Sequence, residues 1–175
     1  LSAIASLPLG AIFGVTTLIQ LLELAHPSQP LFRKLLLEAP GTYHHSVIVA
    51  SLAERAAESI GADTLLVRVA SYYHDVGKTV RPYFFIENQM EGTNIHDTMD
   101  PQASAQAIIA HVTDGLALAR RYRLPQEVTE AIQQHHGTRP TFYFYNKAVK
   151  AAEEAGAPVP PEQPYRYPGP KPQTP

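Results

Sequence analysis

Six side chains that can bind a metal are spread over about ninety residues of helix-like sequence. They are His45, His74, Asp75, His111, His135 and His136. Each lies in a segment whose inward positions are otherwise apolar, so the six can converge only where helices pack together. Imidazole suits first-row transition metals, and a single carboxylate can bridge two cations because it has two oxygens. The pattern therefore predicts a site for two metals and indicates a hydrolase.

Capping residues, proline and glycine divide the chain into helices. Helices are expected to begin at Thr42, Asp63, Asp100-Pro101, Leu124-Pro125 and Phe142. A shorter helix precedes Pro40-Gly41, and Gly61 and Gly137 are placed to end helices. No apolar–polar alternation is long enough to build a sheet, so we predict an all-α fold, a helical bundle.

The same helices place the candidate ligands. The helix after Thr42 is expected to bury one face, at Val49, Leu52, Ala53, Ala56 and Ile60, and His45 lies four residues before Val49 on that face. The His74-Asp75 pair is closely followed by Gly77, which predicts a helix end. Adjacent helical side chains point about 100° apart. His135 and His136 can therefore serve one centre best where their helix is ending.

Two segments are not expected to be helical. The stretch from Thr79 to Pro101 mixes aromatic and polar residues without a period, and irregular segments between helices commonly line binding sites. The sequence after Ala155 holds much of the chain's proline, which rules out a helix or a central strand. We predict a proline-rich loop near the C-terminal end.

Composition excludes some functions. The formal net charge is −2 and the pI is near 6.5, which gives no electrostatic basis for binding long nucleic acid. The absence of cysteine excludes disulfides, thiolate zinc sites and a cysteine nucleophile. Leu1 to Phe13 is uncharged but too short to cross a bilayer, since a spanning helix needs roughly 20 apolar residues. It is either a buried or swapped N-terminal segment or, as we favour, the tail of a transmembrane helix.

The order of the six residues resembles the HD-domain superfamily of metal-dependent phosphohydrolases. Five local sequences extend the likeness: EAPGTYHHS (38–46), YYHDVGK (72–78), RPYFFIENQ (81–89), QHHGT (134–138) and RYPGPKPQT (166–174). They are similar to the cytoplasmic domain of the seven-transmembrane HD proteins, whose activity is hydrolysis of cyclic di-AMP. The resemblance implies that residues 1–25 are the end of a membrane helix and a connector. Residues 26–175 would then be an HD phosphohydrolase domain, truncated before its last helices, in the cytoplasmic part of a bacterial inner-membrane protein.

The resemblance also implies a ligand set. One metal would be held by His45, His74 and Asp75, and the second by Asp75, His111, His135 and His136, with iron or manganese as the two divalent cations. The family completes the first metal with an aspartate on a later helix. No aspartate follows Asp114 in this sequence, so that ligand is absent from it.

Five side chains are candidates for contacts with the substrate. Lys78 lies three residues after Asp75 and is placed to neutralise phosphate charge. Arg81 either holds a second phosphate or forms a surface ion pair. Tyr83 and Tyr143 either stack on adenine or belong to the core, where we expect at least one of the aromatic residues 83–85. His96 either reaches the substrate or stabilises its loop.

The expected reaction is hydrolysis of cyclic di-AMP to the linear dinucleotide pApA by a water that bridges the two metals, with Asp75 and Lys78 as catalytic residues. Two alternatives stay open: a sensor that binds a cyclic dinucleotide without cleaving it, and an HD phosphohydrolase acting on another nucleotide. The expected partners are the cyclic dinucleotide and, through a preceding transmembrane region, a membrane. A homodimer is left open.

Overall fold

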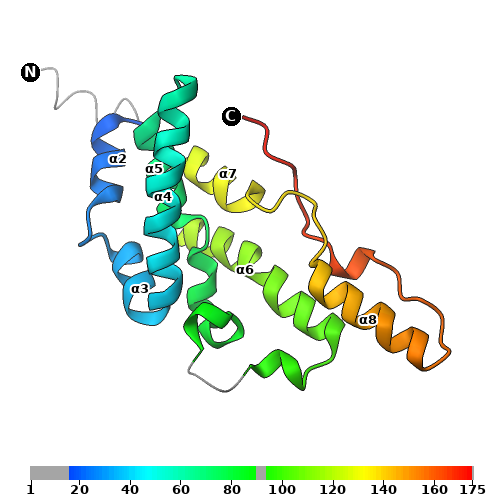
Figure 1. Cartoon of the computed structure of the whole chain (residues 1–175). Coiled ribbons are helices and arrows are strands. Elements are labelled where there is room, and N and C mark those ends of the chain that lie inside the picture. The colour runs from blue at the N-terminus through cyan, green and yellow to red at the C-terminus, as the bar shows by residue number, and fades with distance from the viewer. Residues whose placement is uncertain (1–15, 90–93, 175) are drawn as a thin grey trace, which may run out of the picture.

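The computed structural model describes residues 16–89 and 94–174 (Figure 1). The α-helices of this part of the chain are α2 (Leu18–Ala25), α3 (Pro30–Glu38), α4 (Pro40–Ile60), α5 (Thr64–Tyr73), α6 (Pro101–Arg121), α7 (Gln126–Gln134) and α8 (Phe142–Glu154). Short 3₁₀ helices are η1 (Val76–Val80), η2 (Pro82–Phe84), η3 (Ile86–Asn88), η4 (Ile95–Asp97) and η5 (Gln163–Tyr165). Apart from an isolated bridge between Pro140 and Arg166, the described residues contain no β-structure. The all-α prediction is confirmed.

Most helix ends lie where the sequence places them. The Asp63 and Asp100 side chains accept hydrogen bonds from the backbone N–H groups of Leu66 and Ala103, so both residues cap helices as predicted. Gly61 and Gly137 have φ of 71° and 57°, the left-handed conformation that ends α4 and follows α7. The prediction for Thr42 is wrong. Helix α4 begins at Pro40, because the fixed φ of proline suits the first helical position.

The main hydrophobic core lies among α2, α3, α5, η1, α6 and α7. Its buried members are Leu21, Leu24, Leu31, Phe32, Leu35, Ala39, Val69, Tyr73, Val76, Leu118, Ala119, Val128 and Ile132. The Tyr73 hydroxyl donates a hydrogen bond to the Leu24 carbonyl oxygen at 2.8 Å, so its polar atom is satisfied inside the core. A smaller cluster of Ala105, Phe144 and Tyr165 joins α6, α8 and η5. The core fixes α5, α6 and α7. His111 lies on α6, and the pairs His74-Asp75 and His135-His136 directly follow α5 and α7.

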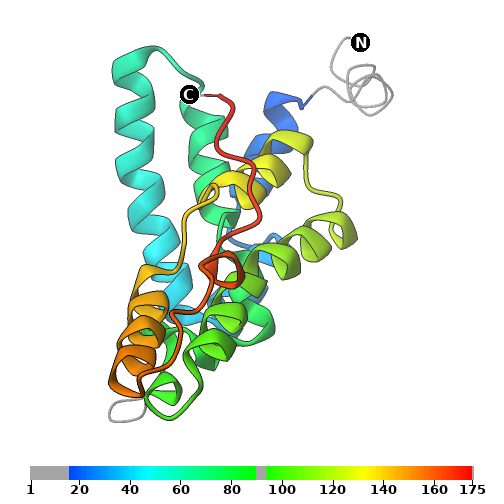
Figure 2. The same cartoon turned by 90° about the vertical axis from the view of Figure 1, so that its right-hand side faces the viewer.

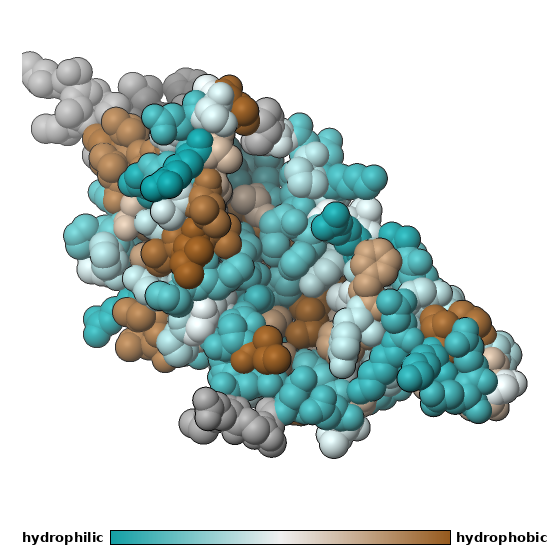
Figure 3. Space-filling view, viewed as in Figure 1, coloured by the Kyte–Doolittle hydropathy of each residue, from teal (hydrophilic) through white to brown (hydrophobic). Residues whose placement is uncertain are grey.

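The predicted buried face of α4 is wrong. Leu52 and Ile60 are 64% and 67% exposed, and Figure 3 shows hydrophobic side chains on the outer surface of this helix. The buried residues of α4 are instead Thr42, Ser46, Ala50 and Ala57. Small side chains at four-residue spacing let the α4 backbone approach α5 closely, and the larger apolar side chains then point outward. His45 is consequently half-exposed rather than buried.

The N-terminal prediction lies partly outside the described residues. Residues 1–15 are not described, whereas residues 18–25 form α2, which buries Leu21 and Leu24 in the main core. Within residues 16–89 and 94–174, no helix combines the length and the apolar character that crossing a bilayer requires.

The proline-rich tail passes beside the end of α7, which Figures 1 and 2 show from two sides. A Cβ atom on Gly137 would lie 3.6 Å from Lys171, and the Gln173 backbone N–H donates to Gln134 Oε1 at 3.1 Å. The tail therefore closes against the segment that carries His135 and His136.

Candidate metal centre

Asp75 lies at the centre of the site. It is the second residue after α5 and directly precedes η1, and its residue surface is only 3% exposed. Its Oδ1 lies 3.2 Å from His111 Nε2 and 3.5 Å from His135 Nε2. Its Oδ2 lies 3.1 Å from His74 Nε2 and 3.8 Å from His45 Nε2. Both carboxylate oxygens thus face imidazole nitrogens, one from the neighbouring His74 and the others from α4, α6 and the end of α7.

The six residues fall into two groups that share Asp75. One ligand atom from each of Asp75, His111, His135 and His136 lies within 4.8 Å of the others. The same holds for His45, His74 and Asp75. The two groups contain the same residues as the two ligand sets that the family resemblance implies. His74 and His135 each follow the last residue of a helix, at the positions where glycine signals predicted helix ends.

Hydrogen bonds orient the imidazoles. The Nδ1 atoms of His74, His111 and His135 lie 2.7, 2.6 and 2.9 Å from the carbonyl oxygens of Ser71, Ile108 and Ile132, each three residues earlier. A carbonyl oxygen only accepts hydrogen bonds, so Nδ1 carries the proton and the Nε2 lone pair is free. The His111 and His135 Nε2 atoms then face each other at 3.3 Å.

This arrangement fits a cation. Asp75 Oδ1 is buried and receives no hydrogen bond from any described residue, although two imidazole nitrogens are near it. Lone pairs of several imidazoles and a carboxylate therefore converge on one small volume, which is unfavourable unless a positive charge is present. The donor set matches transition metals rather than magnesium or calcium, which prefer oxygen ligands.

The pKa values of Asp75, His45 and His136 favour the ligating forms. His74 is the exception, because burial by itself would lower its pKa but the charge of Asp75 and a hydrogen bond to it raise that pKa. Burial by itself would raise the pKa of Asp75, but the charge that His74 carries when protonated, and the hydrogen bonds that His111 and His135 donate when protonated, lower it well below its ordinary value. Burial, with the charges of His135 and His111, lowers the pKa of His136 to about 3. Burial is also the main cause that lowers the pKa of His45. Near pH 7 Asp75 is therefore a carboxylate, and His45 and His136 are neutral imidazoles, the forms that bind metals.

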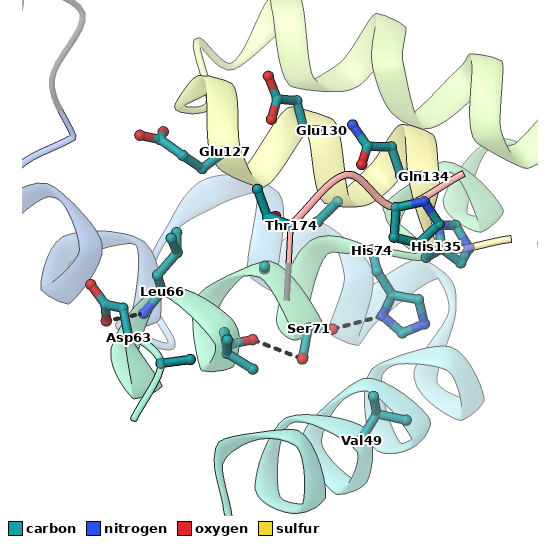
Figure 4. A pocket seen from close by; sticks show the side chains of 15 residues that line it. Val49, Asp63, Leu66, Ser71, His74, Glu127, Glu130, Gln134, His135 and Thr174 are labelled. Carbon is teal, nitrogen blue, oxygen red and sulfur yellow. Dashed lines mark hydrogen bonds between the residues drawn. The ribbon is translucent and has the colours of Figure 1, made fainter. Parts of the chain in front are cut away.

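A cavity of about 520 Å³ adjoins the centre (Figure 4). His74 and His135 contribute to its wall, with mostly apolar side chains of α4 and α5 and with Pro172 and Thr174 of the tail. The α7 side is largely polar and is formed by Glu127, Glu130, Ala131 and Gln134. Figure 4 shows the hydrogen bond between the Ser71 carbonyl oxygen and the His74 ring. None of the predicted substrate residues lines this cavity.

Of the predicted substrate residues, Lys78 lies at the centre itself. Its Nζ donates to Asp75 Oδ2 at 2.9 Å and to Glu87 Oε1 at 2.8 Å. Burial alone would lower the pKa of Lys78, but the charges of Asp75 and Glu87 raise it above its ordinary value. The ammonium group is therefore charged at neutral pH.

The other candidates are arranged differently. Arg81 forms an ion pair with Asp114 at 2.5 Å. Tyr83 and Tyr143 are 55% and 65% exposed, whereas Phe85 is buried, as expected for one member of that aromatic run. His96 is buried, and its Nε2 lies 2.8 Å from the Phe84 carbonyl oxygen. This contact favours the loop-stabilising role for His96, and its contact with substrate stays a prediction.

The sequence profile of the HD domain family matches residues 42–166. The chain belongs to the HD domain family.

Within the HD domain family, the chain is similar to proteins named PgpH. This HD domain is 51% identical over 162 residues to the cyclic-di-AMP phosphodiesterase PgpH of Bacillus subtilis, and 49% identical over 163 residues to PgpH of Listeria monocytogenes. Each match covers 93% of this chain and 22% of the relative, so the chain spans about a fifth of the length of these curated relatives. The solved HD domain of L. monocytogenes PgpH in complex with cyclic-di-AMP matches with a TM-score of 0.78 and 48% identity, covering 85% of this chain and 67% of that one.

Sequence reasoning missed Tyr167, which supports a candidate ligand. The Tyr167 ring stacks on His136 with centroids 4.0 Å apart and planes at 14°, and it meets His111 edge-on at 6.0 Å. It is 8% exposed although it lies in the proline-rich tail. An aromatic residue within a proline-rich stretch was the available signal, because such a residue commonly anchors a loop.

Replacing Tyr167 with alanine is expected to lower the free energy of unfolding by about 3 kcal/mol, because a buried aromatic ring is lost. Metal affinity should fall by about 10-fold, since His136 loses the ring that orients it. Tyr167→Phe is the matched control and should stay within about 0.5 kcal/mol of wild type. Urea denaturation and metal titration measure both quantities. Equal metal affinity in the alanine variant would show that the stack does not orient His136.

Proposed function

We propose that this HD domain is a metal-dependent phosphodiesterase that hydrolyses cyclic di-AMP to the linear dinucleotide pApA. The observation that carries the proposal is the pairing of two facts. Five candidate histidine ligands surround the buried carboxylate of Asp75, and the solved relative that holds cyclic-di-AMP is 48% identical with a TM-score of 0.78. A phosphodiester cleavage needs both a positively charged centre and a place for the two phosphates.

We propose that His45, His74 and Asp75 hold one divalent cation and that Asp75, His111, His135 and His136 hold another. Imidazole-rich ligand sets support iron or manganese as the metals. When bound, such cations stabilise negative charge on a phosphate and make a nearby water acidic enough to lose its proton near neutral pH. The first group has three protein ligands and the second has four, so we expect tighter binding at the second.

The residues of the chain account for the rest of the reaction. The water oxygen forms a bond to phosphorus while the bond from phosphorus to the 3′ oxygen breaks, and the 3′ oxygen takes up a proton. The Lys78 ammonium offsets charge that builds on the phosphate oxygens, and it is already held beside Asp75. Arg81 would hold the second phosphate only by leaving Asp114. The exposed rings of Tyr83 and Tyr143 are available to stack on adenine.

Incubation of the protein with manganese or ferrous iron and cyclic di-AMP tests the proposal, with chromatography of the product. Formation of pApA is expected. If cyclic di-AMP binds but survives with each metal, the domain is a sensor for the ligand. If another nucleotide is cleaved and cyclic di-AMP is neither bound nor cleaved, the substrate assignment is wrong.

Lys78→Met is expected to lower kcat for this reaction by about 100-fold, because a preorganised charge beside the phosphate is lost. The side chain keeps its length, so packing changes little. Lys150→Met is the matched control, since the Lys150 side chain is 77% exposed. Steady-state kinetics give kcat for both variants. An unchanged kcat in Lys78→Met would show that Lys78 has no catalytic role.

We also propose that the domain belongs to the cytoplasmic part of a larger bacterial inner-membrane protein. The relatives are several times longer than this chain, which covers 22% of their length. The uncharged sequence from Leu1 to Phe13 supports a preceding membrane segment. Fractionation of cells that express the full-length protein, with detection of this domain in the membrane fraction, tests the assignment.

A further inference from the structure

We infer that Glu87 is a positioning residue that holds the Lys78 ammonium group where the phosphate of the substrate must bind. The inference rests on the proposed function, because the role of Lys78 is defined by that reaction. Glu87 lies in η3, within the irregular segment between α5 and α6, and the family resemblance implies no role for it.

The Lys78 side chain is fixed from three directions. Its Nζ lies 2.9 Å from Asp75 Oδ2, 2.8 Å from Glu87 Oε1 and 5.0 Å from the centre of the Phe85 ring. The side chain is only 14% exposed. An ammonium group has three protons, so two serve the carboxylates and one remains for a phosphate oxygen.

Of the two carboxylates, only Glu87 lies outside both candidate metal groups. Asp75 Oδ2 also faces His74 and His45, and Asp75 belongs to both candidate metal groups. A cation held by Asp75 competes for that oxygen and repels the ammonium. A flexible lysine would then leave its place unless a second anion held it. Glu87 is the second carboxylate at hydrogen-bond distance from Lys78 among the described residues.

Glu87 is itself anchored to the first turn of α4. The Thr42 hydroxyl donates to Glu87 Oε1 at 3.1 Å, and Asn88 Nδ2 donates to the Thr42 hydroxyl at 2.8 Å. Asn88 Oδ1 accepts from the Thr42 backbone N–H at 3.1 Å, which satisfies a free donor at the start of the helix. A Cβ on Gly41 would lie 1.8 Å from the Glu87 carbonyl oxygen, so glycine there permits the approach.

The charge of Glu87 also argues for this role. A carboxylate next to a phosphate site repels the substrate, so it is favourable there only when it serves a cation. Burial alone would raise the pKa of Glu87, but the Lys78 charge and its hydrogen bonds lower it, so the group is ionised at neutral pH. The N-terminus of α4 is a favourable place for that negative charge.

A double-mutant cycle separates positioning from simple structural support. The variants are Glu87→Gln, Lys78→Met and the double variant, with kcat and KM measured for cyclic di-AMP and manganese. Glu87→Gln should lower kcat by about 10-fold, as is common for residues that support a functional group, and change KM less than about 2-fold. In the Lys78→Met background, the same change should have almost no effect. An equal loss in both backgrounds would overturn the inference.

Two controls sharpen the cycle. Glu87→Asp keeps the charge and should recover part of the lost kcat, whereas exposed Glu58→Gln should match wild type. Metal content by elemental analysis should be the same in Glu87→Gln and wild type. A large drop in metal content would place Glu87 in metal binding and overturn the positioning role.

A readout without catalysis distinguishes failure of this inference from failure of the proposed function. If the wild-type protein cleaves no cyclic di-AMP, the proposed function fails, and crystal structures of wild type and Glu87→Gln with manganese decide the position of Lys78. Displacement of Lys78 Nζ in the variant supports the inference. An unchanged Nζ position in the variant overturns it.

Discussion

Replacing Asp75 with asparagine should lower kcat/KM for cyclic di-AMP at least about 1000-fold, which corresponds to about 4 kcal/mol of transition-state stabilisation. Asp75 is the member that both candidate metal groups share, and its two oxygens face different sets of histidines. An amide keeps the shape but loses the charge and one of the two acceptor oxygens. Metal content should therefore fall at both positions.

His45→Ala is the informative comparison for Asp75→Asn. His45 belongs to one group only, so its loss should weaken one cation and leave the group with His111, His135 and His136 intact. Elemental analysis and circular dichroism of the two variants separate metal loss from unfolding. An asparagine variant that retains both metals and full activity would show that Asp75 is not the shared ligand.

Replacing Gly77 with alanine is expected to lower the free energy of unfolding by about 3 kcal/mol or to prevent folding. A Cβ at this position would lie 1.8 Å from the His111 carbonyl oxygen and 2.5 Å from the Gly115 backbone nitrogen. These are backbone atoms of α6, so no side-chain rotation relieves the clash. The helix must move away from η1, and His111 moves with it away from Asp75.

Thermal and urea denaturation measure the effect of Gly77→Ala. Gly61→Ala is the matched control, because a Cβ there meets no atom within 4 Å and the cost of its positive φ is only about 1 kcal/mol. If the two alanine variants have equal stability and equal metal content, the close approach of η1 to α6 is not what holds His111.

Local signals in the sequence account for much of the helical framework. Asp63 and Asp100 cap helices because their side chains bond backbone donors within the same turn, an interaction that needs no distant residue. His74 and His135 stand at helix ends because glycine follows within a few positions. The sequence also predicts that α5, α6 and α7 pack together, because the candidate metal ligands in these segments lie at otherwise apolar positions.

The orientation of α4 could not be predicted from its hydrophobic pattern. Larger apolar residues such as Leu52 and Ile60 formed the more apolar stripe, yet the helix packs through Ser46, Ala50 and Ala57. Small residues let two helix backbones approach closely and make many van der Waals contacts, and the hydrophobicity of the residues does not reveal this. The half-exposed position of His45 follows from that choice of face.

The sequence also did not predict the residues that position other functional side chains. Glu87 and Tyr167 lie in irregular segments whose path is set by contacts with α4 and α7. The family resemblance draws attention to the local sequences RPYFFIENQ and RYPGPKPQT but assigns neither residue. Their contacts with Lys78 and His136 depend on tertiary placement, which no spacing rule encodes.

Anomalous scattering at the manganese edge, from crystals grown with manganese, shows directly whether two cations share Asp75. We expect two peaks that share Asp75, one among His111, His135 and His136 and the other beside His45 and His74. Active crystals whose peaks all lie away from Asp75 would contradict this expectation.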